Sequence, residues 1–335
     1  MQGMQTSVRD QDKSSGTELE SVTTSESAPV ARGPLPVLLI NAMRPKQWTK
    51  NVLLFAGLLF ALQFTHLDAI LRAFAGFALF CLLSSCVYIM NDLVDREKDR
   101  LNKRTASRPI ASGALKPQVA ITFVAILLPV TLALSYWLSP WFAFIGAVYM
   151  AKDFAYSFGL KHVVIMDVFL IAAGFTIRAA AGAIAIGAPI SSWLYMVTTL
   201  GALFLALNKR KHELILLGEG AGSHRRVLSD YSTALVDEML AVITASTLMA
   251  YSLYTFTAEN LPRQLRDNHL MMLTIPFVLY GIFRYLYLVF QKDVGSSPEE
   301  VLLKDRPLLV CVLLWGATAA VLLYIFSPLS GLFPA

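Results

Sequence analysis

The sequence predicts an all-α, polytopic membrane protein with about nine transmembrane helices. The chain has 335 residues, of which 56% are hydrophobic and only 15% are charged, whereas soluble domains carry about 25% charged residues. Apolar runs of about 20 residues recur along the chain, and each is long enough to cross a bilayer. The runs are continuous rather than alternating, which favours helices over a β-barrel.

The N-terminal segment differs in composition from the rest of the chain. Residues 1–33 are rich in Ser, Thr, Glu and Gln and nearly free of aromatic residues. Such a segment cannot supply a hydrophobic core. We therefore predict a disordered tail at 1–33 and one transmembrane domain at 34–335.

An interfacial helix is expected from Leu35, and the predicted spans follow it. The spans cover residues 50–66, 69–92, 118–138, 140–159, 164–186, 190–208, 232–256, 269–290 and 307–328. Lys and Arg gather before the first span and in every second loop after it. Because cation-rich loops stay on the cytoplasmic side, we predict that the N-terminus and these loops face the cytoplasm.

The densest group of charges follows the second predicted span. Asn91, Asp92, Asp95 and Asp99 have helical spacing and are expected on one face of a helix that continues this span. Carboxylates this close repel one another unless a cation lies between them, and their oxygens suit Mg²⁺. We predict all four residues as metal ligands and the three aspartates as catalytic residues. The alternative is a solvated helix end with internal salt bridges.

Cations after this helix are candidates for binding phosphate oxygens. Lys103, Arg104 and Arg108 follow within ten residues of Asp99, and arginine offers a bidentate fork to phosphate. Pro109 and Gly113 are expected to end the helix and fold the loop back. The alternative role of these cations is to anchor the loop in the cytoplasm.

Polar residues at the start of the first span form another candidate group. Lys46, Gln47 and Lys50 surround Trp48. We expect a phosphate pocket there, with Lys46 and Lys50 on one helix face because they are four residues apart. The alternative is an interfacial aromatic belt whose lysines extend to the lipid headgroups.

The charged stretch also carries a resemblance to a known family. N-D-x-x-D-x-x-x-D followed by N-K-R-x-x-x-R-P-I-A-S-G, at residues 91–113, resembles the UbiA-type intramembrane prenyltransferase superfamily. The resemblance covers the chain from about Arg44 to the C-terminus. It implies a UbiA-type bundle of nine spans, an active site at the cytoplasmic face of a bacterial plasma (inner) membrane, Mg²⁺ as cofactor and polyprenyl substrates.

A departure from the usual pattern indicates a particular branch. Superfamily members that prenylate aromatic acceptors carry a second aspartate-rich motif after the sixth span, whereas residues 208–231 here read NKRKHELILLGEGAGSHRRVLSDY. This segment, RPKQWTKN at 44–51 and the run at 156–183 are similar to the branch that moves a 5-phosphoribosyl group from phosphoribosyl diphosphate (PRPP) to a polyprenyl (decaprenyl) phosphate. That reaction opens the synthesis of cell-wall arabinan precursors.

This resemblance implies PRPP, a polyprenyl phosphate and the bilayer as partners, with no nucleic acid, and it leaves a homo-oligomer open. PRPP carries one diphosphate, which the aspartate helix would bind with Asn91 as a further contact. The acceptor carries one monophosphate, for which the cationic patch at Lys209 and Arg210 is suited. The alternative is a Mg-dependent prenyltransferase that joins a polyprenyl diphosphate to an aromatic acceptor. A transporter would instead carry charges near the membrane midplane.

Ionisable residues inside the later spans complete the candidate site, since such residues usually face the bundle interior. We interpret Tyr156 and Lys161 as phosphate or ribose contacts. We interpret Asp167 as a ribose-hydroxyl contact or as a group that supports one.

Three further charged residues inside the spans have structural alternatives. Lys152 and Asp153 are adjacent, and a local ion pair between them is the alternative to a functional role. Arg178 lies deeper, and we expect it to pair with a carboxylate such as Asp237 or Glu238.

Overall fold

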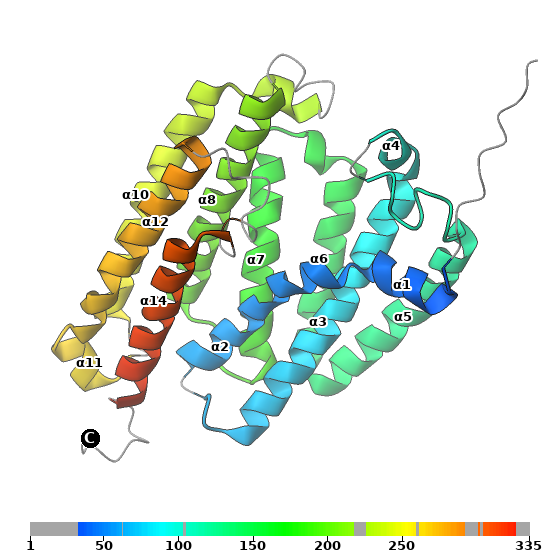
Figure 1. Cartoon of the computed structure of the whole chain (residues 1–335). Helices are drawn as coiled ribbons and strands as arrows, with labels where there is room; N and C mark the ends of the chain where they lie inside the picture. Colours follow the sequence, from blue (N-terminus) through cyan, green and yellow to red (C-terminus); the bar gives the residue numbers. More distant parts are fainter. Residues whose placement is uncertain are drawn as a thin grey trace, which may run out of the picture. The chain divides into compact units, whose positions relative to one another are not determined.

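Long helices form where the sequence has its apolar runs, because a helix satisfies its backbone polar groups within its own segment. The computed structural model describes residues 33–325 apart from 62, 103–104, 218–225, 259–260, 292–300 and 302–303. Its long helices are α3 (Leu67–Val94), α5 (Pro117–Leu138), α6 (Pro140–Phe158), α7 (Met166–Ala185), α8 (Ser192–Leu217), α10 (Thr233–Thr257), α12 (Ile275–Gln291) and α14 (Arg306–Ile325) (Figure 1).

Shorter elements connect these helices. They are α1 (Leu35–Met43), η1 (Pro45–Leu54), α2 (Phe55–Phe60), α4 (Arg96–Leu101), η2 (Leu160–His162), η4 (Arg226–Asp230), α11 (Arg263–Asp267) and η5 (Leu270–Thr274). The all-helical prediction is confirmed for the described residues. Within the part of the chain that the structure describes, six helical segments are long and apolar enough to cross a membrane, and the count of nine spans stays a prediction. The predicted tail at 1–33 lies outside the described residues except for Gly33.

The long helices pack against their neighbours in chain order. Contacts join α3 to α5, α5 to α6, α6 to α7, α7 to α8, α8 to α10, α10 to α12, and α12 to α14. One hydrophobic core forms around α3, α5 and α6, with Phe80 and Phe142 fully buried. A second core forms around α7, α8, α10 and α12, with Leu207 and Val236 fully buried. Helix α7 therefore lies between two cores, beside both α6 and α8.

The first predicted span is not one regular helix. The 3₁₀ segment η1 begins at Pro45 and continues as the short helix α2. Its backbone presses against α7, because a Cβ added to Gly182 would lie only 1.9 Å from the carbonyl oxygen of Leu54. Since a 3₁₀ helix has three residues per turn, the expectation that Lys46 and Lys50 share a helix face is wrong.

The predicted aspartate helix is divided in two. Helix α3 ends at Val94, Asp95 lies in a turn with φ −91° and ψ 11°, and α4 follows. The next described segment folds back as expected, since the Thr105 hydroxyl donates to the carbonyl of Asp99 at 3.0 Å. Gly113 has a φ of +79°, which favours glycine. Figure 1 shows α4 and the C-terminal end of α8 at the same end of the bundle, opposite α11.

Candidate active site

Three aspartates gather where α3 meets α4, and the protein's own cations hold them. Arg108 Nη1 donates to Asp92 Oδ1 at 3.1 Å and to Asp99 Oδ2 at 2.5 Å. Arg44 also donates to Asp92 Oδ1. A single guanidinium thus bridges the two outer aspartates, and we name Asp92, Asp95, Asp99 and their cations the carboxylate cluster.

The third aspartate faces a different element. Lys161 Nζ, on η2, lies 3.1 Å from Asp95 Oδ1 and 3.4 Å from Oδ2. Asn91 Oδ1 accepts a hydrogen bond from the Ser157 hydroxyl near the end of α6. The break in the helix at Asp95 turns this side chain toward η2, which is how the cluster reaches from α3 to the α6–α7 connection.

The donor set of this cluster fits a divalent metal in chemistry. Carboxylate oxygens are hard ligands of the kind that Mg²⁺ prefers. Asp92 Oδ2 is buried and accepts no hydrogen bond from the described residues, so one oxygen is left for a ligand. Among the described residues no group of three or more His, Cys, Asp or Glu side chains has the arrangement of a metal site. The predicted ligands Asn91, Asp92, Asp95 and Asp99 therefore stay a prediction.

The polar and basic residues predicted as further phosphate contacts differ in whether the structure describes them and in how exposed they are. Lys103 and Arg104 lie outside the described residues. On η1, Lys46 is exposed, and Gln47 and Lys50 are half-buried.

Sequence reasoning missed Arg44, which reaches Asp92 from the residue before η1. Arg44 has the positive φ of 54° that directs the chain from α1 into η1. The signal was present, because Arg44 opens the RPKQWTKN motif.

A second group of charges lies where α7, α8 and the residue after η4 meet. Asp167 and Arg210 are both fully buried, and Arg210 Nε donates to Asp167 Oδ2 at 2.7 Å. The Tyr231 hydroxyl donates to Asp167 Oδ1 at 2.8 Å, and Arg210 also donates to Glu213. We name these four residues the buried ion-pair cluster. Since protein groups occupy both oxygens of Asp167, its supporting role is favoured over direct contact with ribose.

The backbone just before α7 forms a strained turn that sets the position of Asp167. Ile165 has a φ of 69°, and Met166 N–H donates to the carbonyl of Val164 at 2.8 Å, which makes a tight turn rarely adopted by a β-branched residue. The Tyr231 hydroxyl accepts from Ile165 N–H at 2.7 Å. Burial and the hydrogen bond to Asp167 raise the pKa of Tyr231 to about 12. Its hydroxyl therefore keeps its proton and braces the turn.

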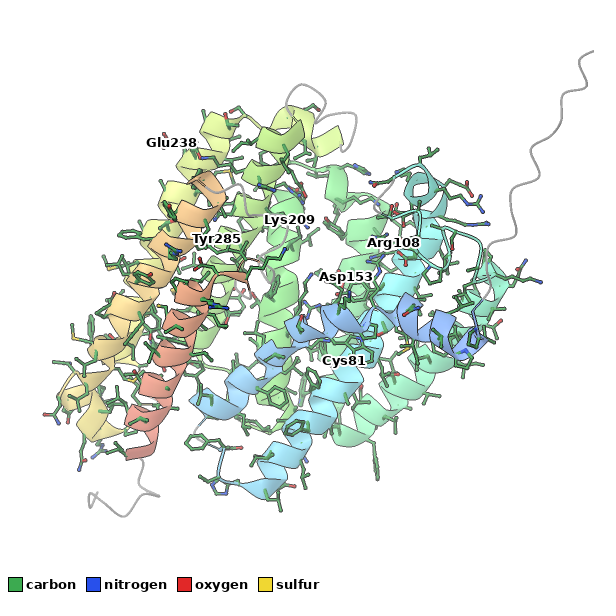
Figure 2. All side chains as sticks on the ribbon, in the orientation of Figure 1. Cys81, Arg108, Asp153, Lys209, Glu238 and Tyr285 are labelled. Carbon is green, nitrogen blue, oxygen red and sulfur yellow. The ribbon has the colours of Figure 1, made fainter. Side chains whose placement is uncertain are left out.

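Arg210 retains one donor group for a ligand. Its Nη2 is buried and has no hydrogen-bond partner among the described residues, and buried donors are rarely left in this state. Tyr156 on α6 lies close enough to interact electrostatically with Arg210, and Lys209 is half-buried beside it on α8. Figure 2 shows Lys209, Asp153 and Arg108 in the half of the bundle that holds α4.

Two of the deeper charges pair with each other. Lys152 Nζ donates to Asp153 Oδ1 at 2.6 Å, so the ion pair named as the alternative for these residues is present. The predicted partner of Arg178 is wrong, because Asp237 pairs with Lys211 on α8 instead.

Arg178 faces η1 and α6 rather than α10, and neutral acceptors hold it. Its three nitrogens donate to Asn51 Oδ1 at 2.8 Å, to the Gly174 carbonyl at 2.7 Å and to the Tyr149 hydroxyl at 2.9 Å.

Comparison with known proteins places this chain in a family. The model of the UbiA prenyltransferase family matches residues 52–297. The decaprenyl-phosphate phosphoribosyltransferase of Mycolicibacterium smegmatis is 33% identical over 324 residues, which cover 91% of this chain and 99% of that protein. The enzyme of the same name from Mycobacterium tuberculosis (strain CDC 1551 / Oshkosh) is 31% identical over 303 residues, covering 89% and 97%.

A solved structure has the same fold. A UbiA homolog from Archaeoglobus fulgidus bound to DMAPP and Mg²⁺ matches with a TM-score of 0.63 at 18% identity, and the match covers 85% of this chain and 98% of that one. The sequence match and the fold match each extend over most of the chain. The chain belongs to the UbiA prenyltransferase family.

Proposed function

We propose that this enzyme transfers a 5-phosphoribosyl group from PRPP to decaprenyl phosphate and releases diphosphate. The observation that carries the proposal is the similarity, over nine-tenths of the chain, to an enzyme named decaprenyl-phosphate phosphoribosyltransferase. The two charged clusters support it, since one is rich in carboxylates and the other holds a buried arginine with an open donor. A prenyltransferase acting on an aromatic acceptor is less well supported, because relatives matched over most of the chain carry the phosphoribosyltransferase name.

The carboxylate cluster is the proposed binding site of the PRPP diphosphate. Asn91, Asp92, Asp95 and Asp99 would hold a Mg²⁺ ion, which would supply positive charge beside the departing diphosphate. Arg108 and Lys161 each donate to an aspartate of this cluster. Both would donate to diphosphate oxygens, which offer the arginine a bidentate partner. These contacts stabilise the negative charge that builds as the bond between ribose C1 and the diphosphate oxygen breaks.

The acceptor phosphate is proposed to bind at Arg210 and Lys209. Arg210 Nη2 offers an unpaired donor, while Asp167 and Tyr231 hold the guanidinium in one orientation. A phosphate oxygen is already anionic, so it bonds to C1 without a general base, and these side chains only need to align it. The contacts predicted for Lys46, Gln47, Lys50, Lys103, Arg104 and Tyr156 stay proposals.

The proposed setting is a bacterial plasma membrane with both clusters on the cytoplasmic side. Asp95 lies between α3 and α4, and Arg210 lies on α8. Figure 1 shows α4 and the C-terminal end of α8 at the same end of the bundle. Cytoplasmic placement gives the site access to PRPP, which is water-soluble, while the apolar tail of the acceptor stays in the bilayer.

Two parallel transfer assays test the proposal. The purified chain in detergent receives Mg²⁺ with labelled PRPP and decaprenyl phosphate, and separately Mg²⁺ with labelled 4-hydroxybenzoate and a prenyl diphosphate. We expect a labelled lipid from PRPP that disappears on chelation and in Asp95→Ala. A product in the aromatic reaction alone would refute the proposal and support the prenyltransferase alternative.

A further inference from the structure

The carboxylate cluster is balanced by cations from three separate parts of the chain. Its three carboxylates are paired with Arg44 before η1, Arg108 in the segment after α4, and Lys161 on η2. Among the described residues, these three cations match the three negative charges, so a dication meets a largely neutralised site rather than one with three negative charges. Coulomb attraction to such a site is much weaker.

Arg108 occupies the position that matters most for a metal. Its Nη1 lies 3.1 Å from Asp92 Oδ1 and 2.5 Å from Asp99 Oδ2, which is the place where a cation shared by two carboxylates would sit. A guanidinium does not lose its proton in proteins, so its charge leaves only when the side chain moves.

The surroundings of Arg108 allow that movement. Its side chain is 30% exposed, whereas Asp92 is 2% exposed. Arg108 lies in the folded-back turn after α4 rather than in a long helix. A new anionic partner at the surface can therefore draw Arg108 away without unfolding a packed element.

We propose that Arg108 excludes a divalent metal from the carboxylate cluster until a diphosphate arrives, so that metal and diphosphate bind as a coupled pair. This inference rests on the proposed function, which places both ligands at this cluster. A metal alone would put two positive charges beside a guanidinium that has no other anionic partner to receive it. A diphosphate gives the guanidinium a bidentate partner and frees the oxygens of Asp92 and Asp99.

The consequence is reciprocal coupling. If diphosphate raises the affinity for the metal, the metal raises the affinity for diphosphate by the same factor. The bound metal would then leave the site when diphosphate leaves. Product release would empty both positions together, and the cations would return to the carboxylates.

The test measures Mn²⁺ binding by the full chain in detergent, using the electron paramagnetic resonance signal of free Mn²⁺. Titrations are run with and without inorganic diphosphate, and a protein-free blank corrects for Mn²⁺ held by diphosphate in solution. We expect diphosphate to tighten Mn²⁺ binding to the unmodified chain at least tenfold. Without diphosphate, Arg108→Gln should bind Mn²⁺ about tenfold more tightly than the unmodified chain, a change of about 1.4 kcal/mol, and should gain less from added diphosphate.

Two variants show whether Mn²⁺ affinity depends on the position of the cation that is removed or only on its charge. Lys98→Gln removes one exposed cation from α4 and should leave Mn²⁺ affinity unchanged. Arg108→Lys keeps the charge and should keep Mn²⁺ binding weak. If Arg108→Gln does not fold, Lys161→Gln, which frees Asp95, should show a smaller gain of the same kind.

Equal or weaker Mn²⁺ binding by folded Arg108→Gln would overturn the inference, as would an equal gain in Lys98→Gln. The titrations contain neither PRPP nor lipid, so they report on Arg108 even if the transfer assay fails. If transfer from PRPP is seen while Mn²⁺ affinity does not respond to Arg108, this inference falls and the proposed function stands.

Discussion

The two charged clusters differ in how far their cations are open to solvent. In the carboxylate cluster the Arg108 side chain is 30% exposed above an Asp92 that is 2% exposed. In the buried ion-pair cluster Arg210 is 1% exposed and Asp167 is fully buried. Separating a buried ion pair leaves an uncompensated charge at a cost of several kcal/mol, whereas an exposed cation is partly solvated when it moves. The first cluster is suited to exchange partners with a ligand, and the second to hold a side chain still.

The difference originates in the elements that carry the cations. Arg108 comes from a turn whose backbone is held by a few hydrogen bonds, such as that from Thr105 to Asp99. Arg210 comes from α8, which packs against both α7 and α10. A helix with two packed neighbours cannot turn its arginine outward without disturbing a core.

The largest expected effect is on activity through the carboxylate cluster. Asp92→Asn removes the charge that both Arg108 and the metal site require, so we expect transfer to fall by about 10³-fold. The rate of lipid labelling from PRPP measures it. Asp68→Asn, at the exposed opposite end of α3, is the control and should retain activity. Residual activity above a tenth of normal in Asp92→Asn would place the catalytic charge elsewhere.

The next effect is on stability through the buried ion-pair cluster. Asp167→Ala leaves Arg210 Nε without its acceptor, and we expect the free energy of unfolding to fall by about 3 kcal/mol. Denaturation by sodium dodecyl sulfate in mixed micelles measures it. Asp230→Ala removes an exposed carboxylate next to Tyr231 and should change stability by less than about 0.5 kcal/mol. An equally small change in Asp167→Ala would show that this pair does not hold α7 to α8.

A third change tests whether the contact between η1 and α7 positions the carboxylate cluster without affecting the buried ion-pair cluster. Gly182→Ala forces a Cβ against the Leu54 carbonyl and should cost about 2 kcal/mol by overpacking. It displaces η1, which begins beside Arg44, so transfer should weaken while the buried ion-pair cluster stays intact. Gly201→Ala on α8 has open space around the new Cβ and serves as the control. The same unfolding measurement together with the transfer rate decides the outcome.

The smallest effect concerns the Tyr231 hydroxyl. Tyr231→Phe removes its bonds to Asp167 and Ile165, and we expect a loss of about 1 kcal/mol at neutral pH. The pKa of Tyr231 is raised from 10.0 to about 12, so the folded state keeps the proton that the unfolded state releases above pH 10.

The advantage of the tyrosine should therefore be complete below pH 10 and should disappear as pH rises through about 12. Unfolding curves of both proteins between pH 8 and pH 12 measure this difference. A gap between the two proteins that stays constant over that range would contradict the assigned hydrogen bond.

Sequence patterns indicated the residues of the carboxylate cluster because these patterns are local. The spacing of Asn91, Asp92, Asp95 and Asp99 indicated one charged helix end, and three of these four side chains are buried or half-buried beside cations. The pattern did not reveal the turn at Asp95, because helical spacing continues on both sides of it. The expectation of one regular helix at residues 50–66 was also wrong. The close contact between the Leu54 carbonyl and Gly182 of α7 cannot be read from the local sequence.

The sequence by itself determined the all-helical class, the apolar segments and the family, because these follow from composition and from motifs within a few dozen residues. Only the tertiary structure decided the pairing of charges. Asp92 meets Arg44 across 48 positions and Asp95 meets Lys161 across 66, and Arg178 finds Asn51 instead of the carboxylate expected for it. Many cations in the chain are chemically acceptable partners for each aspartate. Helix packing selects among them, because a buried charge must take whichever partner its neighbouring helices bring within hydrogen-bond distance.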